Sequence, residues 1–546
     1  MRRRHMQHAD AVYLNGLLYT GDAQRRFAQA LATKEGKIVA VGRDDDIRAL
    51  AGPATRIVDL AGRLMLPGLI DGHVHPLEGH QILGDFDLSG INDPDAILQR
   101  IRACADATPN EPWVYLGGAN LAAFGAYPTR ELLDRIVPDR PLLVVGFDVH
   151  SGCLNTKGLE AAGIHADTPD PAGGVYERDA SGAPNGVVHE AAFYRVCPII
   201  PQLSPAGYPK SLAKAHAMAH GYGLTGWFDA RVEEAELNAY ADAQRAGTLK
   251  VYMSAGLYAN PRRDPREQIE RFARWRREYE CDNLRLHTVK IFVDGVPESK
   301  TAALLEPYAG TDDCGLALWS QDALNEICLL ADTAGFDLHF HTLADRAVRM
   351  TLDALEYVQI RNGMRDRRAQ LAHLQLVDPA DMSRFNRLGA IASVQTLWTA
   401  AREEQQQLYR DLLGAERTAR NYPFRSLRNA GAMLAAGSDW SVSTMDPMQI
   451  IQTGVTHLLI DQPDSPPWNP HERLDLLTML EAYTVNTAYA LRFDDCTGSL
   501  EAGKDASFAI LDRNPFAHPV ETFAQTRVIE TCFRGEVVYA APGRAD

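Results

Sequence analysis

The chain has 546 residues and a formal net charge of −16, and hydrophobic and charged residues make up 46% and 23% of it. This composition is typical of a soluble globular protein with a large core. The acidic balance excludes nucleic acid and anionic membrane as the main partner, because both would need a basic patch. No run approaches the roughly 18 apolar residues of a membrane span, and no apolar stretch of a signal peptide follows Arg2, Arg3 and Arg4. We therefore expect a cytoplasmic protein.

Both ends of the chain show the pattern of short β-strands. The expected strands lie at residues 11–19 (a hairpin around Asn15-Gly16), 37–41, 56–60, 506–511, 528–533 and 536–539. Because these strand-rich ends flank a central region with a different sequence pattern, we predict one small composite β-sandwich domain from residues 1–66 and 498–546. Two independent end domains are the alternative.

Between the ends, short apolar runs alternate with helical stretches. Eight runs predict strands, at residues 69–75, 226–230, 249–254, 286–293, 336–341, 370–375, 391–395 and 433–439. Helical patterns lie between most of them, for example at residues 265–280, 321–334 and 345–359. Eight repeats of strand then helix are typical of a closed parallel barrel and not of an open doubly wound sheet. We therefore predict an α/β protein with a TIM-like (β/α)8 barrel over residues 67–75 and 206–497.

The first two barrel strands are separated by about 150 residues, whereas a βα loop usually has 2–6. This gap contains its own expected strands at residues 113–116 and 142–145, and a turn-rich hairpin at residues 173–188. We predict that residues 76–205 form an inserted subdomain after the first strand. A lid of this kind over the barrel mouth would exclude water and shape a substrate pocket.

The segment from Gly68 to His75 carries the strongest local signal for chemistry. Side chains in a strand repeat every two residues, so His73 and His75 point to the same face. At the carboxyl end of a barrel strand, two such imidazoles can bind one divalent ion, and Asp71 is close enough to orient one of them. A His-x-His pair is, however, a weak signal by itself.

The ends of further strands strengthen this signal. Ionisable or metal-ligating residues lie at or near the ends of apolar runs, namely Lys290 and Asp294 on the fourth strand, His339 and His341 on the fifth, His373 on the sixth and Asp439 on the eighth. A lysine within such a run is costly unless it is neutralised or paired. The arrangement predicts a metal centre at the carboxyl ends of the barrel strands.

With these residues the chain resembles the amidohydrolase superfamily over nearly its whole length, including the two-ended β domain. Four segments are similar to the amidohydrolase family 3 (YtcJ-like) branch, which includes N-substituted formamide deformylase: Asp148 to Asn155, Val289 to Val296, His341 to Ala347, and Gly437 to Trp440. Two positions depart from the branch. After the seventh strand, the branch has Gln-Pro followed by a histidine, whereas this chain has Gln395-Thr396-Leu397-Trp398. After the fifth-strand histidine, the branch has Gly-Asp, whereas this chain has Ala344-Asp345. The first departure lies by the expected pocket, so no substrate is transferred from a relative.

The resemblance implies a set of metal ligands, which comprises His73, His75, Lys290, His341, His373 and Asp439. One or two divalent ions are implied, with zinc the expected metal, and Lys290 would bridge two of them as a carbamate formed with carbon dioxide. The metal would lower the pKa of a bound water to about 7. Asp439 would take the proton of that water as it attacks a carbonyl carbon, and would pass it to the leaving nitrogen. The implied reaction cleaves a C–N bond in an amide, an N-substituted formamide or a cyclic amide.

Several residues have two interpretations. His150 in the insertion could contact substrate or cap a turn, and Asp345 could be catalytic, contact substrate or cap the helix that follows it. Trp398 is a further candidate for substrate contact. His339 lies one residue pair deeper than His341, which favours a packed core histidine. For Lys290, the alternative to the carbamate is an ammonium group paired with Asp294.

Three other functions are compatible with the same sequence. A deaminase of this superfamily would use one metal and a glutamate after the fifth strand, near which Asp345 stands. An ester hydrolase or a decarboxylase could use the same barrel. A non-catalytic relative would typically have lost ligands, whereas all six are present here. The expected partner is a small-molecule substrate, and the oligomeric state stays open, a homodimer included.

Overall fold

The computed structural model describes residues 8–24, 26–83, 86–147, 151–171, 174–201 and 205–542. The chain divides into two compact units. The first comprises Met1–Val74, His216–Asp439 and Ser443–Asp546, and the second comprises His75–Ala215 and Trp440–Val442. Within the described residues, every helix is too short or too polar to span a lipid bilayer.

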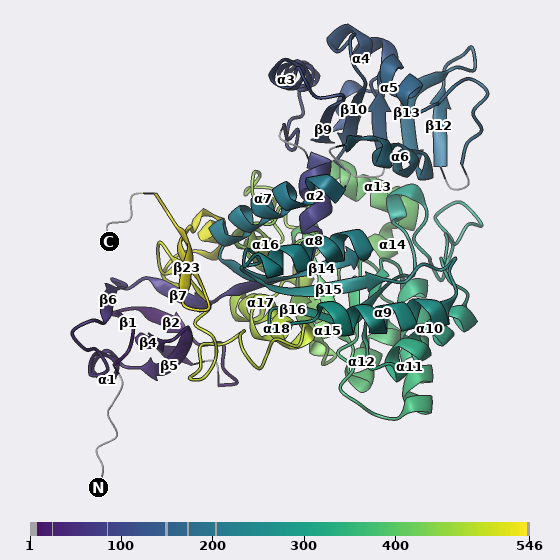
Figure 1. Cartoon of the computed structure of the whole chain (residues 1–546). Coiled ribbons are helices and arrows are strands. Elements are labelled where there is room, and N and C mark those ends of the chain that lie inside the picture. The colour runs from purple at the N-terminus through teal and green to yellow at the C-terminus, as the bar shows by residue number, and fades with distance from the viewer. Residues whose placement is uncertain are drawn as a thin grey trace. The chain divides into compact units, whose positions relative to one another are not determined.

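The first unit contains an eight-stranded parallel sheet that curves into a barrel (Figure 1). Its strands follow one another in chain order: β8 (Leu69–Val74), β14 (Leu224–Val232), β15 (Tyr252–Tyr258), β16 (Leu284–Phe292), β17 (Asp337–Thr342), β18 (Gln370–His373), β19 (Ile391–Val394) and β20 (Met433–Ala436). Neighbouring strands pair in parallel throughout. The predicted α/β class with a TIM-like barrel is confirmed. The predicted and observed strand bounds differ most in the third strand, which begins at Tyr252 and not at Leu249.

The first and last barrel strands approach each other at two glycines. A Cβ atom on Gly437 would lie 2.4 Å from the main-chain nitrogen of His73, and one on Gly72 would lie 2.7 Å from the carbonyl oxygen of Ala436. Just beyond, the main-chain N–H of Asp439 donates to the carbonyl oxygen of His73 at 2.7 Å. Because glycine has no Cβ, β8 and β20 can come into main-chain contact here. This contact brings the ends of the first and eighth strands together.

Helices follow most of the barrel strands, as the sequence pattern predicts. Those with the clearest sequence signals are α9 (Pro265–Tyr279), α10 (Gln321–Thr333), α11 (Asp345–Asn362), α12 (Pro379–Leu388) and α16 (Pro447–Thr456). Three of these begin with an Asp-Pro pair, whose aspartate accepts a hydrogen bond from the second residue after it, as in Asp264, Asp378 and Asp446. Proline loses nothing at the first helical position, because its missing N–H would have had no helical partner. Local sequence therefore fixes where these helices start.

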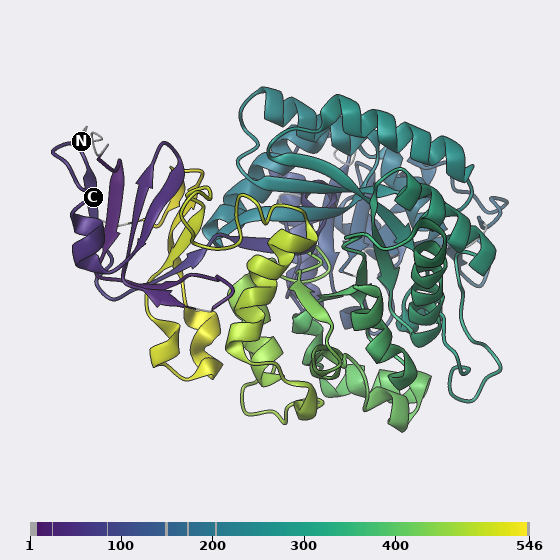
Figure 2. The same cartoon turned by 90° about the horizontal axis from the view of Figure 1, so that it is seen from below.

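Both ends of the chain build the β-sandwich of the first unit (Figure 2). One sheet has the order β5-β4-β1-β6, with β5 (Lys37–Gly42), β4 (Ala30–Lys34), β1 (Ala11–Leu14) and β6 (Arg56–Asp59). The other has the order β23-β22-β21-β7-β2-β3, with β23 (Glu536–Ala540), β22 (Val528–Phe533), β21 (Phe508–Leu511), β7 (Leu64–Pro67), β2 (Leu17–Tyr19) and β3 (Phe27–Ala28). β7 and β21 pair antiparallel, with Pro67 opposite Phe508. The shared core includes Tyr13 and Phe508, whose ring centroids are 5.0 Å apart.

The prediction of a hairpin around Asn15-Gly16 is wrong, because β1 and β2 belong to different sheets. Asn15 has a φ of 56°, its main-chain N–H donates to Asp44 (2.6 Å), and its side-chain amide donates to Asp59 (3.1 Å). A turn does form at this dipeptide, but it carries the chain from one sheet of the sandwich to the other. Each strand then finds its partners elsewhere, β1 in β4 and β6, and β2 in β3 and β7.

The second unit has its own five-stranded sheet, of order β12-β13-β11-β10-β9. The strands are β12 (Gly174–Arg178), β13 (Pro184–Glu190), β11 (Ser151–Leu154), β10 (Leu142–Gly146) and β9 (Val114–Ala119). The hairpin predicted in this region is present as the antiparallel pair β12 and β13. His189 on β13 links its neighbours, since its ring nitrogens lie 2.9 Å from Ser151 Oγ and 2.9 Å from Glu177 Oε1.

Candidate metal centre

The two histidines of the first barrel strand lie at its carboxyl end. His73 is on β8, and His75 follows one residue beyond the strand. Asp71, which is buried, accepts hydrogen bonds at Oδ1 from the main-chain N–H of His73 (3.1 Å) and of Ser438 (2.9 Å). Burial raises the pKa of Asp71 to about 7, although these hydrogen bonds act in the opposite direction. Asp71 thus accepts main-chain hydrogen bonds from the first strand and from the segment after the eighth, together with one from the Ser438 side chain, so it orients the strand end.

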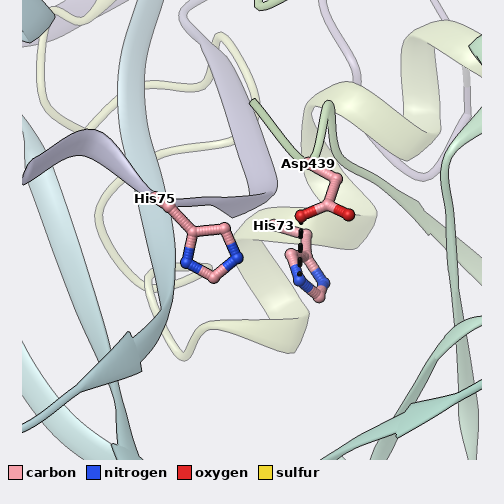
Figure 3. Close-up of side chains that lie close together, drawn as sticks. All are labelled: His73, His75 and Asp439. Carbon is pink, nitrogen blue, oxygen red and sulfur yellow. Dashed lines mark ion pairs between the residues drawn. The ribbon is translucent and has the colours of Figure 1, made fainter. Parts of the chain in front are cut away.

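Asp439 lies opposite His73, just beyond the eighth strand (Figure 3). Its Oδ1 is 3.5 Å from His73 Nε2. His73, His75 and Asp439 each offer one ligand atom, and these three atoms lie within 4.8 Å of one another. Asp439 has a φ of 53°, in the left-handed region, which costs of order 1–3 kcal/mol for a non-glycine residue. Strained backbone of this kind is concentrated at functional sites.

Two further imidazoles come from β17 and β18. The ring centroid of His373 is 4.8 Å from that of His73 and 4.6 Å from that of His341. His373 Nδ1 is 4.0 Å from Asp439 Oδ2, and His373, like Asp439, has a positive φ, of 78°. The structure therefore brings His73, His341, His373 and Asp439 together, although they are far apart in the sequence.

Lys290 is fully buried on β16. Its Nζ is 3.3 Å from Nδ1 of His339, which is also fully buried, and 4.8 Å from the ring centroid of Phe292. Burial lowers the pKa of Lys290 to about 7, while the carboxylate of Asp439 acts in the opposite direction. His339 packs against the ring of Phe228, with 4.7 Å between centroids, in keeping with a buried core position.

Asp294 is not the partner of Lys290. Its carboxylate accepts main-chain N–H groups from Ala303 (3.1 Å), Leu343 (3.0 Å) and Ala344 (3.1 Å), and its Oδ1 is 3.4 Å from His341 Nδ1. Among the described residues, no ion pair joins Lys290 to Asp294. Asp294 instead connects the end of β16 to the turn that follows His341.

The remaining predicted candidates lie in different surroundings. The indole of Trp398 stacks on His373, with 5.3 Å between centroids and 18° between ring planes. Asp345 is not the N-cap of α11, which is Ala344. Asp345 is instead the first helical residue, and its carboxylate accepts the N–H groups of Leu305 and Arg346, both at 2.9 Å. His150 lies outside the described residues.

One residue of the site was missed at the level of sequence. Gln395, buried directly after β19, accepts two hydrogen bonds from His373 at its Oε1. The only signal available was its position at the end of a barrel strand, where the departure from the branch begins.

The donor set fits a divalent transition metal. Imidazole nitrogens and a carboxylate oxygen are the ligands that zinc takes in catalytic sites, where three protein ligands leave one position open. The cluster of His73, His75 and Asp439 supplies three such donors, and the rings of His341 and His373 lie beside them. The carboxylate of Asp439 could also transfer protons during a reaction at this site.

Comparison with known proteins agrees with this arrangement. Residues 56–539 match the amidohydrolase family. The protein LONG AFTER FAR-RED 3 of Arabidopsis thaliana is 30% identical over 528 residues, which cover 93% of this chain and 88% of that protein. The N-substituted formamide deformylase of Arthrobacter pascens is 27% identical and covers 98% of this chain and 99% of its own length. An uncharacterized metal-dependent hydrolase from Pyrococcus furiosus shares the fold, with a TM-score of 0.73 at 24% identity over 92% of this chain and 99% of that one. The chain therefore belongs to the amidohydrolase family of hydrolases.

Proposed function

We propose that this protein is a metal-dependent hydrolase that cleaves the C–N bond of a small-molecule amide, N-substituted formamide or cyclic amide. The observation that carries the proposal is the cluster of His73, His75 and Asp439, whose ligand atoms lie within 4.8 Å of one another. The family membership and the deformylase among the relatives support the choice of bond.

The proposed ligands are His73, His75, His341, His373 and Asp439, with zinc as the metal. A bound divalent ion supplies Lewis acidity, which makes water a nucleophile near neutral pH and polarises a carbonyl group. Lys290 is proposed to carry a carbamate, whose two oxygen atoms would hold a negative charge beside the ligands. Two cations would then share the site.

Asp439 is proposed as the general base. Its carboxylate is 9% exposed and lies between His73 and His373, so it can accept a proton from the attacking water. It then returns that proton to the leaving nitrogen, which departs as an amine. Trp398 offers the indole stacked on His373 as a flat apolar surface for substrate. His150 and Asp345 are further proposed substrate contacts.

Metal content, activity and one matched pair of variants test this function. Elemental analysis of the purified protein should find one to two equivalents of zinc or a similar metal, and strong chelators should abolish hydrolysis of a panel of amides and formamides. Asp439→Asn should keep most of the metal and lose about 10²–10⁴-fold in kcat, which is the usual contribution of a general base. Asp495→Asn, an exposed aspartate paired with Arg285, is the control and should keep normal activity. Protein without metal, or chelator-resistant turnover, would contradict the proposal.

A panel of matched esters separates the bond types. If esters were hydrolysed well and amides were not, the proposed C–N specificity would be wrong even with metal bound.

A further inference from the structure

Gln395 makes two hydrogen-bonded contacts with His373, a proposed ligand. We infer that Gln395 is a positioning residue that fixes the tautomer of His373, with the proton on Nδ1 and the lone pair on Nε2. The tautomer follows from hydrogen bonding alone, and its consequence for metal binding rests on the proposed function.

The assignment depends on one oxygen that contacts two nitrogen atoms. Gln395 Oε1 is 3.1 Å from the main-chain nitrogen of His373 and 3.0 Å from its ring Nδ1. A main-chain N–H can only donate, so the amide atom that faces it must be the oxygen and not the NH₂ group. That oxygen can only accept, so Nδ1 must carry a hydrogen. In the neutral ring the lone pair is then on Nε2.

The turn after β19 holds His373 at three points. Gln395 contacts its main chain and its Nδ1 edge, and Trp398, three residues later, covers its face at 5.3 Å. Gln395 is 1% exposed, so water does not compete for its oxygen. The φ of 78° at His373 is a left-handed conformation that a histidine keeps only when its surroundings fix it. The ring therefore has one orientation and one protonation pattern.

This arrangement prepares His373 for a metal. A histidine can ligate a metal only through the nitrogen that has no hydrogen, and an acceptor on the other nitrogen fixes the tautomer and raises the basicity of the ligand. Loss of such an acceptor typically reduces metal affinity by 10–100-fold. Gln395 is expected to act in this way on His373, although it does not itself contact the metal.

Three variants test the inference through zinc affinity, measured by competition with a chelator. Gln395→Leu removes the acceptor and should weaken zinc binding by about 10–100-fold. Gln395→Glu keeps an oxygen at the same place and should retain at least the affinity of the original protein. Gln370→Leu is the matched control, because Gln370 is equally buried on β18, and its Nε2 donates to the carbonyl oxygen of Ala490 and not to a proposed ligand. It should lose some stability and no zinc affinity. Equal affinities for Gln395→Leu and Gln370→Leu would overturn the inference.

A measurement without metal separates this inference from the proposed function. Nitrogen-15 spectra of metal-stripped protein labelled at histidine, recorded at pH 8, identify the signals of residue 373 as those absent in His373→Asn. We expect Nδ1 protonated and Nε2 unprotonated, and a mixture of tautomers in Gln395→Leu. A protonated Nε2 in the original protein would refute the assignment whether or not zinc binds. If the tautomer is as expected and no zinc is bound, the proposed function fails and the positioning role of Gln395 stands.

Discussion

Lys290 is a fully buried lysine in the wall of the barrel. It has no exposed surface, and the partner expected for an ammonium group, Asp294, is held by three main-chain N–H groups. Its Nζ contacts a ring nitrogen of His339 and the face of Phe292. An isolated buried charge is costly. The proposed carbamate, whose anionic oxygens would be paired with bound cations, would avoid the cost of a lone buried ammonium group.

Lys290→Ala should lose most hydrolytic activity, because the truncated side chain cannot form the proposed carbamate. Short carboxylic acids such as acetate should restore part of it by occupying the same place, and a crystal structure of the original protein should show a planar three-atom extension at Nζ. Lys34→Ala is a suitable control, since its amine donates to a carbonyl oxygen in the β-sandwich domain. A bare ammonium in a fully active, metallated protein would leave a mechanism on one metal.

Single residues of the site could be predicted to different degrees. His73, His75 and Asp439 could be predicted because a ligating residue at the end of an apolar strand stands out in the sequence. Gln395 could not, since a glutamine shows its role only when the donor it accepts from is known. That donor, His373, is on the neighbouring strand, and a sequence does not give distances between strands.

At the scale of helices and strands, prediction succeeded where one local pattern decides the outcome. The eight barrel strands are short apolar runs bounded by helices, and the Asp-Pro pairs start helices with their own hydrogen bonds. Prediction failed at Asn15-Gly16. The chain does turn there, but β1 and β2 do not pair with each other as a hairpin would require. Strand pairing depends on residues far along the chain, such as β6 for β1 and β7 for β2.

The C-terminus of α16 makes the stability of the protein depend on pH. His457 caps this helix in a left-handed conformation, is 2% exposed, and donates from Nδ1 to the carbonyl oxygen of Trp468 at 2.7 Å. Burial lowers its pKa from 6.5 to about 4. As the pH falls, the unfolded chain therefore takes up a proton at this residue at a higher pH than the folded chain does. The stability it contributes is present above pH 6.5 and is lost as the pH falls toward 4, up to about 3 kcal/mol.

His457→Asn should flatten this dependence. Asparagine tolerates a left-handed conformation and can donate to the same carbonyl oxygen, but it does not titrate. Urea unfolding at several pH values between 4 and 6.5 should give a smaller loss of stability for the variant than for the original protein. His518→Asn, at an exposed histidine, is the control and should follow the original protein. Parallel curves for all three proteins would contradict the role assigned to His457.

At the scale of the first unit, one carboxylate joins the barrel to the β-sandwich. Asp505 accepts the hydroxyl of Tyr252 on β15 (2.8 Å) and Nε of Arg534 in the turn between β22 and β23 (3.1 Å), and it pairs with Lys37 on β5 (2.5 Å). It is 5% exposed. A single buried residue thus contacts three segments that are distant in the sequence, so barrel and sandwich should unfold together.

Asp505→Asn should destabilise the protein by about 1–3 kcal/mol, because it weakens a buried acceptor of charge-assisted hydrogen bonds. The readout is the midpoint of urea unfolding, together with the number of transitions. Asp495→Asn removes an exposed ion pair with Arg285 and should change stability by no more than about 1 kcal/mol. Two separate transitions in the original protein would show that barrel and sandwich are not coupled.

The pairing of β7 with β21 also has a consequence for the newly made chain. Pro67 leaves the ribosome long before its partner Phe508 exists. At about 5–20 residues per second, the roughly 440 residues between them take roughly 20–90 seconds to synthesise. During that time the edge of β7 that later pairs with β21 has no partner strand, and such an edge is a template for association with other nascent chains. Slow translation or a shortage of chaperones should therefore trap this protein as aggregates that begin at β7.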